Sequence, residues 1–421
     1  MERSLLKPVV AGMVTAVVGF ASSFTVVLAG LRAVGADSRQ AASGLLALCV
    51  AVGVTTIVLS VRHRLPVTAA WSTPGAALLL STGPVDGGYA AAIGAFLVCG
   101  LAIMATGMFP ALGRLVARIP QPVAAAMLAG ILLKLCLAPV AAVSQVPLMA
   151  IPVIVIWALL HRFARMWAVP GALAAAVVAI VVTAPSLTFD ALPVVAPAVP
   201  AFTGSAMIGI ALPLFLVTMA SQNVPGMAVL SGYGYRPPFG EILLTTGAGT
   251  AAGAFLGGHA INLAAISAAL AAGPDAHEDP ARRWIASLTS GISMIVLGLA
   301  AGLATALVLL APPVLIEAVA GLALLGALAA SIAAAFRAGA ERGGVDTAGV
   351  ATAGVEKARV ERAGVERSGV ESAAFTFVVT ASGVSFFGVG SAFWGLLAGG
   401  AFHLLMNYKD SFRSTRVTES A

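Results

Sequence analysis

The polar residues best suited to chemistry in this sequence lie inside apolar segments. The run FLGGHAINLAAISAALAAGP, residues 255–274, places His259 and Asn262 among small and apolar side chains. Histidine exchanges a proton near neutral pH, and an ionisable residue within a membrane span is a functional candidate. The alternative is a neutral histidine bonded to a free backbone carbonyl, with Asn262 satisfying free backbone N–H groups.

A second polar group stands in TMASQNVPGMAVLSGYGYRPP, residues 218–238, where Ser221, Gln222 and Asn223 are consecutive. Three consecutive residues point all round a helix, so at least one of them faces protein. Because Pro225 follows closely, the pattern favours a kinked helix that lines a cavity. Hydrogen bonding between helices, without ligand contact, is the alternative.

Aromatic side chains lie in two other segments. GFASSFTVVLAGL, residues 19–31, contains Phe20, Ser23 and Phe24, and Trp71 lies further along the chain. The three aromatic residues can stack on the ring of an aromatic substrate, or else fill the core. Ser23 allows close packing of helices and also offers a hydroxyl group to a ligand.

Carboxylates are informative by their positions. Asp86, Asp190 and Glu317 are expected near the outer edge of the membrane, and Glu241 near the inner edge. A carboxylate-based proton relay or sodium cage at mid-membrane is therefore disfavoured. The three cysteines stand singly in apolar runs, which predicts neither a disulfide nor a metal site, and no cofactor is expected.

The composition indicates a membrane protein. Of the 421 residues, 60% are hydrophobic and 10% are charged, and the mean hydropathy is +1.01. Soluble domains are about 25% charged. The net charge of +6 is not clustered as a nucleic-acid footprint would be, so no nucleic-acid partner is expected. No cleavable signal peptide is expected either, since MERSLLK leads directly into a long apolar run.

An all-α polytopic membrane protein with fourteen transmembrane segments is predicted, because about 20 helical residues cross a bilayer. The predicted spans are residues 8–30, 40–60, 66–82, 88–112, 120–138, 147–163, 167–185, 205–231, 240–256, 257–273, 284–310, 313–336, 373–388 and 389–408. With both termini cytoplasmic and residues 337–371 left out of the count, fourteen Lys and Arg fall on the inner side and three on the outer side. This distribution fits the positive-inside rule.

Spans 3 and 10 are predicted to be broken. In span 3, Pro74 suits the first helical turn with Ser72 or Thr73 as the cap, which predicts an extended segment and then a short helix over 74–82. That helix is about 13 Å long, half a membrane. In span 10, Gly257 and Gly258 interrupt the chain, and a helix is expected to start near Ala260.

Span 10 comes seven spans after span 3, so the chain is predicted to contain two inverted repeats, residues 1–190 (spans 1–7) and 191–412 (spans 8–14). The two half-helices then begin at mid-membrane from opposite sides. Irregular backbone is tolerated there only against protein or a wet cavity. Two helix starts, each with free N–H groups and partial positive charge, make an anion site. Residues 413–421 are expected to form a cytoplasmic tail.

Residues 337–371 differ from the rest, because the five-residue motifs AGVEK, ARVER, AGVER and SGVES follow one another. The segment is predicted to be a low-complexity cytoplasmic loop between spans 12 and 13. A tolerated insertion is favoured over a regulatory element.

Three motifs together resemble the benzoate/proton symporter (BenE) family: LPVTAAWSTPGAALL, GGHAINLAAISAAL with the following AGPDAHEDPARRW, and TASGVSFFGVGSAFWGLLAG. The resemblance covers nearly the whole chain. It implies the seven-plus-seven inverted repeat of the uracil permeases and sulfate permeases, with a core domain (spans 1–4 and 8–11) and a gate domain (spans 5–7 and 12–14). It also implies a homodimer through the gate domain, and import of benzoate with protons across a bacterial inner membrane.

For such a substrate, the carboxylate is expected between the two helix starts. Thr73 and the backbone near Gly75 approach it from one side, and His259 with the Ala260 N–H from the other. The remaining contacts are then Asn262, Gln222 or Asn223, and the substrate ring lies against Phe20, Phe24 or Trp71, close to Ser23. The proton is carried by His259 or by the substrate itself as benzoic acid.

Two other functions are weighed. One is an exchanger or uniporter for another small organic or inorganic anion. The other is a membrane-embedded enzyme, which needs a nucleophile and base or a metal site at one depth. The sequence offers a lone histidine there, so no enzymatic activity is expected.

Overall fold

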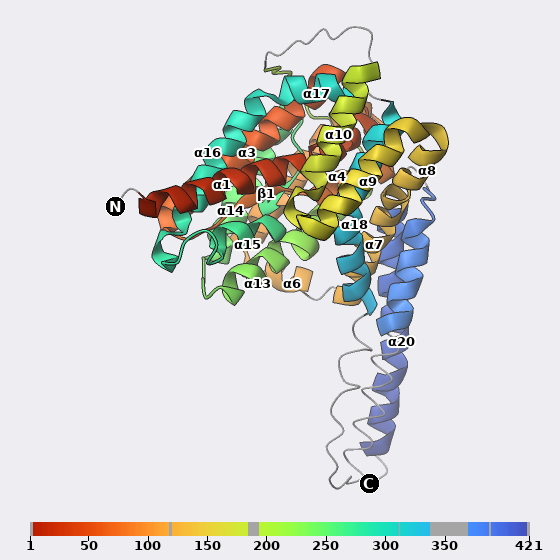
Figure 1. The fold of residues 1–421 in the computed structure, drawn as a ribbon. Coiled ribbons are helices and arrows are strands. Elements are labelled where there is room, and N and C mark those ends of the chain that lie inside the picture. Colours follow the sequence, from red (N-terminus) through yellow and green to blue (C-terminus); the bar gives the residue numbers. More distant parts are fainter. Residues whose placement is uncertain are drawn as a thin grey trace, which may run out of the picture.

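The computed structural model describes residues 3–117, 120–183, 193–310, 312–336, 369–386 and 389–418, which are mostly helical (Figure 1). The first half contains α1 (Arg3–Ala21), α2 (Phe24–Ala33), α3 (Ser38–His63), β1 (Ala69–Trp71), α4 (Thr73–Thr82), α5 (Gly88–Met108), α6 (Pro110–Ala117), α7 (Gln121–Cys136), α8 (Ala138–Gln145), α9 (Pro147–Phe163), η1 (Arg165–Trp167) and α10 (Ala168–Thr183).

The second half repeats the pattern of long helices around one short strand. It contains α11 (Gly204–Ala206), η2 (Met207–Ala211), α12 (Leu212–Thr218), η3 (Met219–Asn223), α13 (Val224–Gly232), α14 (Phe239–Ala254), β2 (Ile261–Leu263), α15 (Ile266–Ala272), η4 (Pro280–Arg282), α16 (Trp284–Leu299), α17 (Ala301–Leu310), α18 (Pro313–Phe336), a helix over Gly369–Ala381 and α20 (Ser391–Thr418).

Among the described residues, seven helical stretches are long and apolar enough to cross a membrane. They are Leu5–Ala33, Ser38–His63, Gly88–Met108, Gln121–Gln145, Arg165–Val182, Gly204–Gly232 and Pro313–Phe336. Large apolar side chains also lie exposed on the surface, with Leu148 91% and Phe163 79% exposed at the two ends of α9. Lipid is the natural environment for such a surface, and the prediction of a helical membrane protein is confirmed. The count of fourteen spans stays a prediction.

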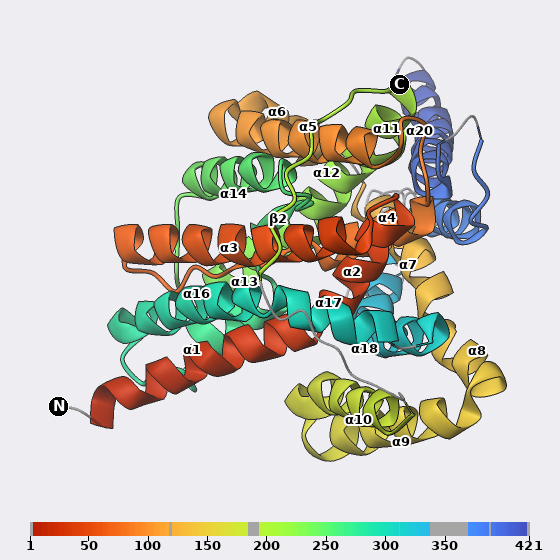
Figure 2. The ribbon, with the colours of Figure 1, turned by 90° about the horizontal axis from the view of Figure 1, so that it is seen from above.

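The helices pack in two groups. Figure 2 shows α5, α14, α3, α16 and α1 side by side in that order, and each contacts the next. In the second group α7 contacts α18 and α20, and α10 contacts α9. The first group comes from predicted spans 1, 2, 4, 9 and 11, and the second from spans 5, 6, 7, 12 and 14. That the two groups move against each other as core and gate stays a prediction.

The two extended segments form one small sheet. β1 and β2 pair antiparallel, with Ala70 opposite Asn262 and Trp71 opposite Ile261. The pairing continues at one end, where the Ser72 N–H donates to the Ala260 carbonyl at 2.8 Å. The chain therefore runs in opposite directions through the two broken segments, as their inverted arrangement requires.

The predicted helix start near Ala260 is wrong. Residues 261–263 are in β2, and α15 begins only at Ile266. The backbone N–H and C=O groups of this segment bond to β1 across the sheet and not to one another along a helix. The chain therefore stays extended as far as Leu263. Gly257, at φ +88°, makes the turn that directs the chain into the strand.

Predicted span 1 is one helical stretch, Leu5–Ala33, interrupted by a turn at Ser22 and Ser23 that its sequence does not predict. α1 ends at Ala21 and α2 begins at Phe24. Between them, Ser22 Oγ donates to the Gly19 carbonyl at 2.9 Å, and Ser23 leaves helical geometry at φ −151°. Serine hydroxyls that bond to nearby carbonyls compete with helical bonds in this way.

Predicted span 8 is continuous but contains two π-helical turns, η2 and η3. Such turns are rare and frequently mark functional sites. The second turn carries Gln222 and Asn223. A kink at this point and a cavity lined by it stay predictions.

Several boundaries differ or fall outside the described residues. The boundary at 190 between the two repeats and residues 337–368 of the predicted loop lie outside them. The helix over Gly369–Ala381 begins within the predicted loop and ends before residue 388, because Gly383 adopts a positive φ of 67°. α20 continues through Thr418, into the predicted tail.

Candidate functional site

Ser72 caps the short helix α4. Its Oγ accepts from the Gly75 N–H at 3.1 Å, and Pro74 lies in the first turn, as the sequence predicts. Thr218 of α12 donates to the same Oγ at 3.0 Å, which joins predicted spans 3 and 8. Thr73, the first residue of α4, is half-buried. The start of α4 carries the partial positive charge of a helix N-terminus.

Backbone N–H groups at the outer edges of the two-stranded sheet donate to side chains from the surrounding helices. On β1, the Ala69 N–H donates to Oγ1 of Thr56 in α3 at 2.9 Å. On β2, the Ile261 N–H donates to Thr250 Oγ1 of α14 at 3.0 Å, and the Leu263 N–H donates to Asn223 Oδ1 at 2.8 Å. All three contacts are buried, so they supply partners that solvent would supply elsewhere.

Asn223 is thus bonded inside the protein, to strand β2 and not to a second helix. Its Nδ2 also donates to Met219 Sδ at 3.3 Å, and its side chain is fully buried. A contact between Asn223 and substrate stays a prediction. The sequence did not single out Thr56, Thr218 or Thr250, because a lone threonine in an apolar run gives no signal of a distant backbone partner.

We expect replacement of Asn223 by leucine to destabilise the protein by about 1–3 kcal/mol, because it leaves the buried Leu263 N–H without an acceptor. Thermal unfolding of the purified protein in detergent measures this loss. Gln222→Leu is the matched control, since Gln222 is half-buried in the same turn. Equal stability of the Asn223→Leu and Gln222→Leu proteins would show that the bond to Leu263 contributes nothing.

His259 and Asn262 are completely buried. Neither ring nitrogen of His259 and neither amide atom of Asn262 has a hydrogen-bond partner at normal geometry among the described residues. The imidazole lies edge-on to Phe96 of α5, with ring centroids 6.4 Å apart. Asn262 shares a face of the sheet with its cross-strand partner Ala70. Unpartnered buried polar groups cost free energy that a polar ligand or water recovers, so both residues remain site candidates.

Four predicted aromatic and serine residues come together. The rings of Phe20 and Phe24 are stacked with centroids 5.0 Å apart, and Phe20 meets the edge of Trp71 at 5.8 Å. Trp71 Nε1 donates to Ser23 Oγ at 2.8 Å. Because Trp71 precedes Ser72, this aromatic cluster lies directly before the start of α4.

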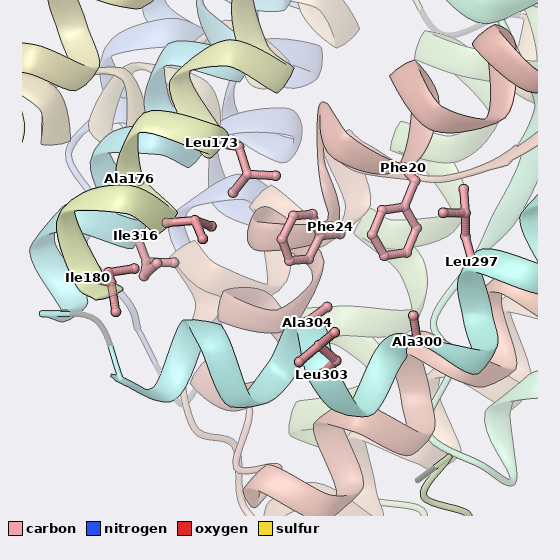
Figure 3. A pocket seen from close by; sticks show the side chains of 11 residues that line it. Phe20, Phe24, Leu173, Ala176, Ile180, Leu297, Ala300, Leu303, Ala304 and Ile316 are labelled. Carbon is pink, nitrogen blue, oxygen red and sulfur yellow. The ribbon is translucent and has the colours of Figure 1, made fainter. Parts of the chain in front are cut away.

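A cavity of about 200 Å³ opens beside this aromatic cluster (Figure 3). Phe20 and Phe24 form part of its wall, and the remaining lining residues are Leu173, Ala176, Val177, Ile180, Leu297, Ala300, Leu303, Ala304 and Ile316. Every lining side chain is apolar. None of the other predicted site residues lines this cavity. The sequence could not single out its aliphatic walls, which resemble any other span.

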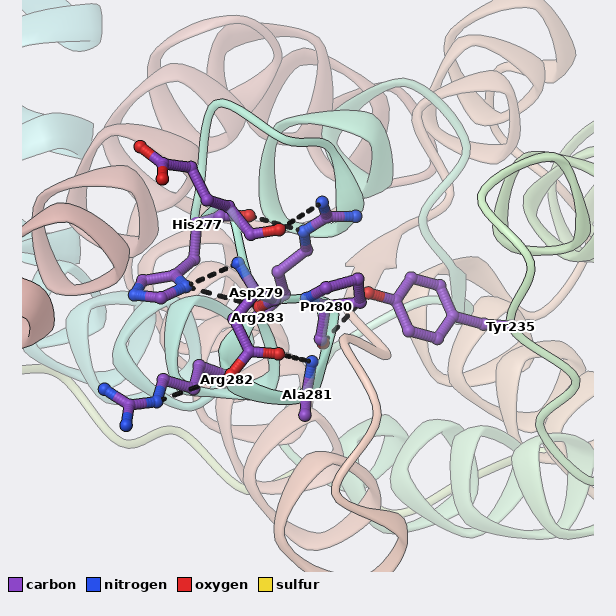
Figure 4. A network of polar contacts seen from close by, with 8 residues as sticks. Tyr235, His277, Asp279, Pro280, Ala281, Arg282 and Arg283 are labelled. Carbon is purple, nitrogen blue, oxygen red and sulfur yellow. Dashed lines mark hydrogen bonds and ion pairs between the residues drawn. The ribbon is translucent and has the colours of Figure 1, made fainter.

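Arg283 anchors the loop that follows α15 (Figure 4). Its buried guanidinium donates to three backbone oxygens, from Nε to His277 at 2.7 Å, from Nη1 to Ala272 at 2.9 Å and from Nη2 to Glu278 at 3.4 Å. Ala272 is the last residue of α15. Arg283 therefore satisfies a free carbonyl at the end of this helix and holds the short helix in place.

Two further contacts fix the same loop. The Tyr235 hydroxyl, from the loop before α14, donates to the Pro280 carbonyl at 3.1 Å. Burial raises the pKa of Tyr235, against the opposing effect of Arg283, so the phenol stays a neutral donor. Lys7 of α1 pairs with Glu278 at 3.0 Å, and this contact lowers the pKa of the Glu278 carboxyl.

Replacing Arg283 by methionine is expected to cost at least about 2 kcal/mol, because bonds from a charged donor contribute about 1.5–3 kcal/mol each. The melting temperature in detergent reports the loss. Arg282→Met is the control, because Arg282 is 47% exposed and pairs with Asp279 at 3.6 Å, a contact worth about 0–1 kcal/mol. A melting temperature for Arg283→Met equal to that of Arg282→Met would contradict the anchoring role.

Comparison with known sequences covers the chain almost end to end. A family model described as benzoate membrane transport protein matches residues 3–405. Inner membrane protein YdcO of Escherichia coli (strain K12) is 34% identical over 400 residues, which cover 94% of this chain and 95% of that protein. The benzoate membrane transport protein of Acinetobacter baylyi is 30% identical over 413 residues, covering 96% and 97%.

Solved structures share the fold. The transmembrane domain of the cyanobacterial bicarbonate transporter BicA matches with a TM-score of 0.57 at 16% identity, over 92% of this chain and 96% of that one. SLC26A9 matches with a TM-score of 0.60 at 13% identity, over 94% of this chain and 65% of that one. At such identities the likeness shows the fold alone, and it confirms the predicted fold class of a helical membrane protein with two inverted repeats.

Proposed function

The chain belongs to the benzoate membrane transport protein family, and from that premise we propose that it imports benzoate, or a close aromatic carboxylate, by proton symport with alternating access. The family makes it a membrane transporter and not an enzyme. Its similarity to an inner membrane protein supports a multi-pass protein of the bacterial inner membrane. Cytoplasmic termini are part of the proposal.

The observation that carries the proposal is the paired sheet beside the capped start of α4 and the aromatic cluster. A carboxylate at the start of α4 gains from the helix dipole and from the half-buried Thr73 hydroxyl. Gln222 in η3 is also half-buried and offers a carboxamide. The ring of the substrate then lies against Phe20 and Phe24.

Co-transport of a proton follows from the charge of the substrate. Moving an anion into a cell with a negative interior costs about 2.3 kcal/mol per 100 mV. One proton cancels this cost and adds the energy of the pH gradient. His259 is the proposed carrier of that proton, because neither of its buried ring nitrogens has a hydrogen-bond partner at normal geometry among the described residues. The other route is benzoic acid itself, which carries its proton on the carboxyl group.

Proteoliposomes containing the purified protein test the proposal. With a more acidic exterior, radiolabelled benzoate is expected to accumulate above its external concentration, and a protonophore is expected to abolish the accumulation. Unlabelled benzoate should compete with the label, and uracil and sulfate should not. Failure to take up benzoate under any imposed gradient would contradict the proposal.

A second candidate is an exchanger or uniporter for another small anion. It is favoured by the likeness to structures described as a bicarbonate transporter and an anion transporter. Counterflow of bicarbonate or sulfate, without dependence on a proton gradient, would support this candidate over proton symport of benzoate.

A further inference from the structure

We propose that the apolar cavity beside Phe20 and Phe24 is the slot for the ring of the transported acid, and that it selects aromatic carboxylates without polar ring substituents. This inference rests on the proposed function and adds a substrate class and a new set of residues to it. We call this cavity the ring slot. It is defined by its walls on α1 and α2, on α10, and on the segment from α16 to α18.

The size of the ring slot suits one aromatic ring. A dry cavity of about 150 Å³ lined by Leu, Ile and Phe admits benzene. The ring slot measures about 200 Å³, which leaves room for a small substituent. Phe20 and Phe24 supply aromatic faces on which such a ring can stack in an offset arrangement.

The chemistry of the walls decides which substituents fit. All the lining side chains are Ala, Val, Leu, Ile or Phe. A methyl group or a halogen placed there gains apolar contact. A hydroxyl group loses its water and finds no side-chain partner, and burying it unbonded is costly. Apolar pockets reject an added hydroxyl by up to about a hundredfold.

The ring slot lies beside the aromatic cluster that precedes the start of α4. Phe20 lines the slot and also meets the edge of Trp71. Trp71 is followed by Ser72, which caps α4. In this proposal a ring in the slot directs its carboxylate toward the aromatic cluster and the start of α4.

The walls also come from both helix groups. Figure 3 shows Phe20 and Phe24 between Leu173, Ala176 and Ile180 of α10 on one side and Leu297 of α16 on the other. The aromatic residues and Leu297 belong to predicted core spans, and the α10 residues to a predicted gate span. A ring that contacts both groups favours the arrangement in which they are close together, and thereby couples ring binding to the conformational equilibrium.

Competition for benzoate uptake in proteoliposomes tests the selectivity. For the wild-type protein, 3-methylbenzoate and 3-chlorobenzoate are expected to compete about as well as benzoate. 3-Hydroxybenzoate is expected to be at least about tenfold weaker, because its hydroxyl is left unbonded. Equal competition by the hydroxylated and methylated acids would overturn the selectivity. Absence of benzoate uptake would instead contradict the proposed function, and this inference with it.

Neighbouring residues of α10 provide a matched pair of variants. Val177 lines the ring slot, and Val178 is 61% exposed on the outer surface. Val177→Phe fills the slot and is expected to raise the half-saturating benzoate concentration by at least about tenfold. Val178→Phe should leave that concentration unchanged. Wild-type benzoate kinetics in a folded Val177→Phe protein would show that the slot holds something else, such as a lipid chain.

A variant that gains affinity for a bulkier acid separates a role in ring binding from damage to the fold. Leu173→Ala enlarges the ring slot and is expected to improve competition by the bulky 3-isopropylbenzoate relative to benzoate. Damage to the fold cannot produce such a change in preference. An unchanged ratio between the two acids in the Leu173→Ala protein would contradict the inference.

Discussion

A His259→Gln protein is expected to exchange benzoate across a proteoliposome membrane without concentrating it. Glutamine retains hydrogen-bonding capacity but cannot carry a proton. His259 is completely buried, and its ring nitrogens have no hydrogen-bond partner at normal geometry among the described residues, so a co-bound anion would supply the partner that a proton on the buried ring needs. Each unit of pH gradient should drive about tenfold accumulation in the wild-type protein, and the variant should lose this entirely.

Counterflow separates loss of coupling from loss of transport. The His259→Gln protein should exchange internal unlabelled benzoate for external label when no pH gradient is present. His161→Gln is the control, since His161 stacks on Trp157 in α9 and is outside the proposed site. Full pH-driven accumulation by His259→Gln would clear His259 of proton carriage, and the proton would then travel as benzoic acid.

The second large effect is expected at the contact between α5 and α14. A Cβ atom on Gly100 would lie 2.6 Å from the Ala251 nitrogen and 2.9 Å from the Gly247 carbonyl oxygen. Real side chains do not approach backbone so closely, so the helices must separate. Overpacking costs about 1–3 kcal/mol and occasionally more, and here the obstacle is backbone on both sides. Gly100→Val should therefore yield little folded protein, as judged by its size-exclusion profile and melting temperature.

Gly247→Val should fail in the same way, since its Cβ would lie 2.6 Å from the Met104 nitrogen. Gly326→Val in α18 is the control, because nothing lies within 4 Å of a Cβ at that position. A comparable loss of folded protein in Gly326→Val would attribute the effect to helix propensity and not to the close approach of α5 and α14.

Local sequence signals predicted most of the architecture. Long apolar runs located the long helices, and the Ser72–Pro74 pattern located the start of α4, because both depend on residues close in the chain. The start of α15 was misplaced, since β2 is extended by pairing with β1 nearly two hundred residues away. No feature of residues 257–273 alone reveals that partner.

The candidate site was predictable in its polar and aromatic members only. Phe20, Phe24, Trp71 and Ser23 stand out from their segments and do meet in the structure. The hydroxyls that hold the sheet and the aliphatic walls of the ring slot do not stand out. Their roles come from three-dimensional neighbours, and the same residue types recur throughout every span.

The threonine and asparagine contacts at the sheet edges restrict how this protein can cycle. Separation of β1 from β2, or of either strand from its supporting helices, would leave several N–H and C=O groups without hydrogen-bond partners. In an environment without water, each such group costs several kcal/mol. Sliding one apolar helix surface over another breaks no such bond. A transport step that presents the site to the opposite side of the membrane should therefore displace the strands and their supporting helices together, as a single block.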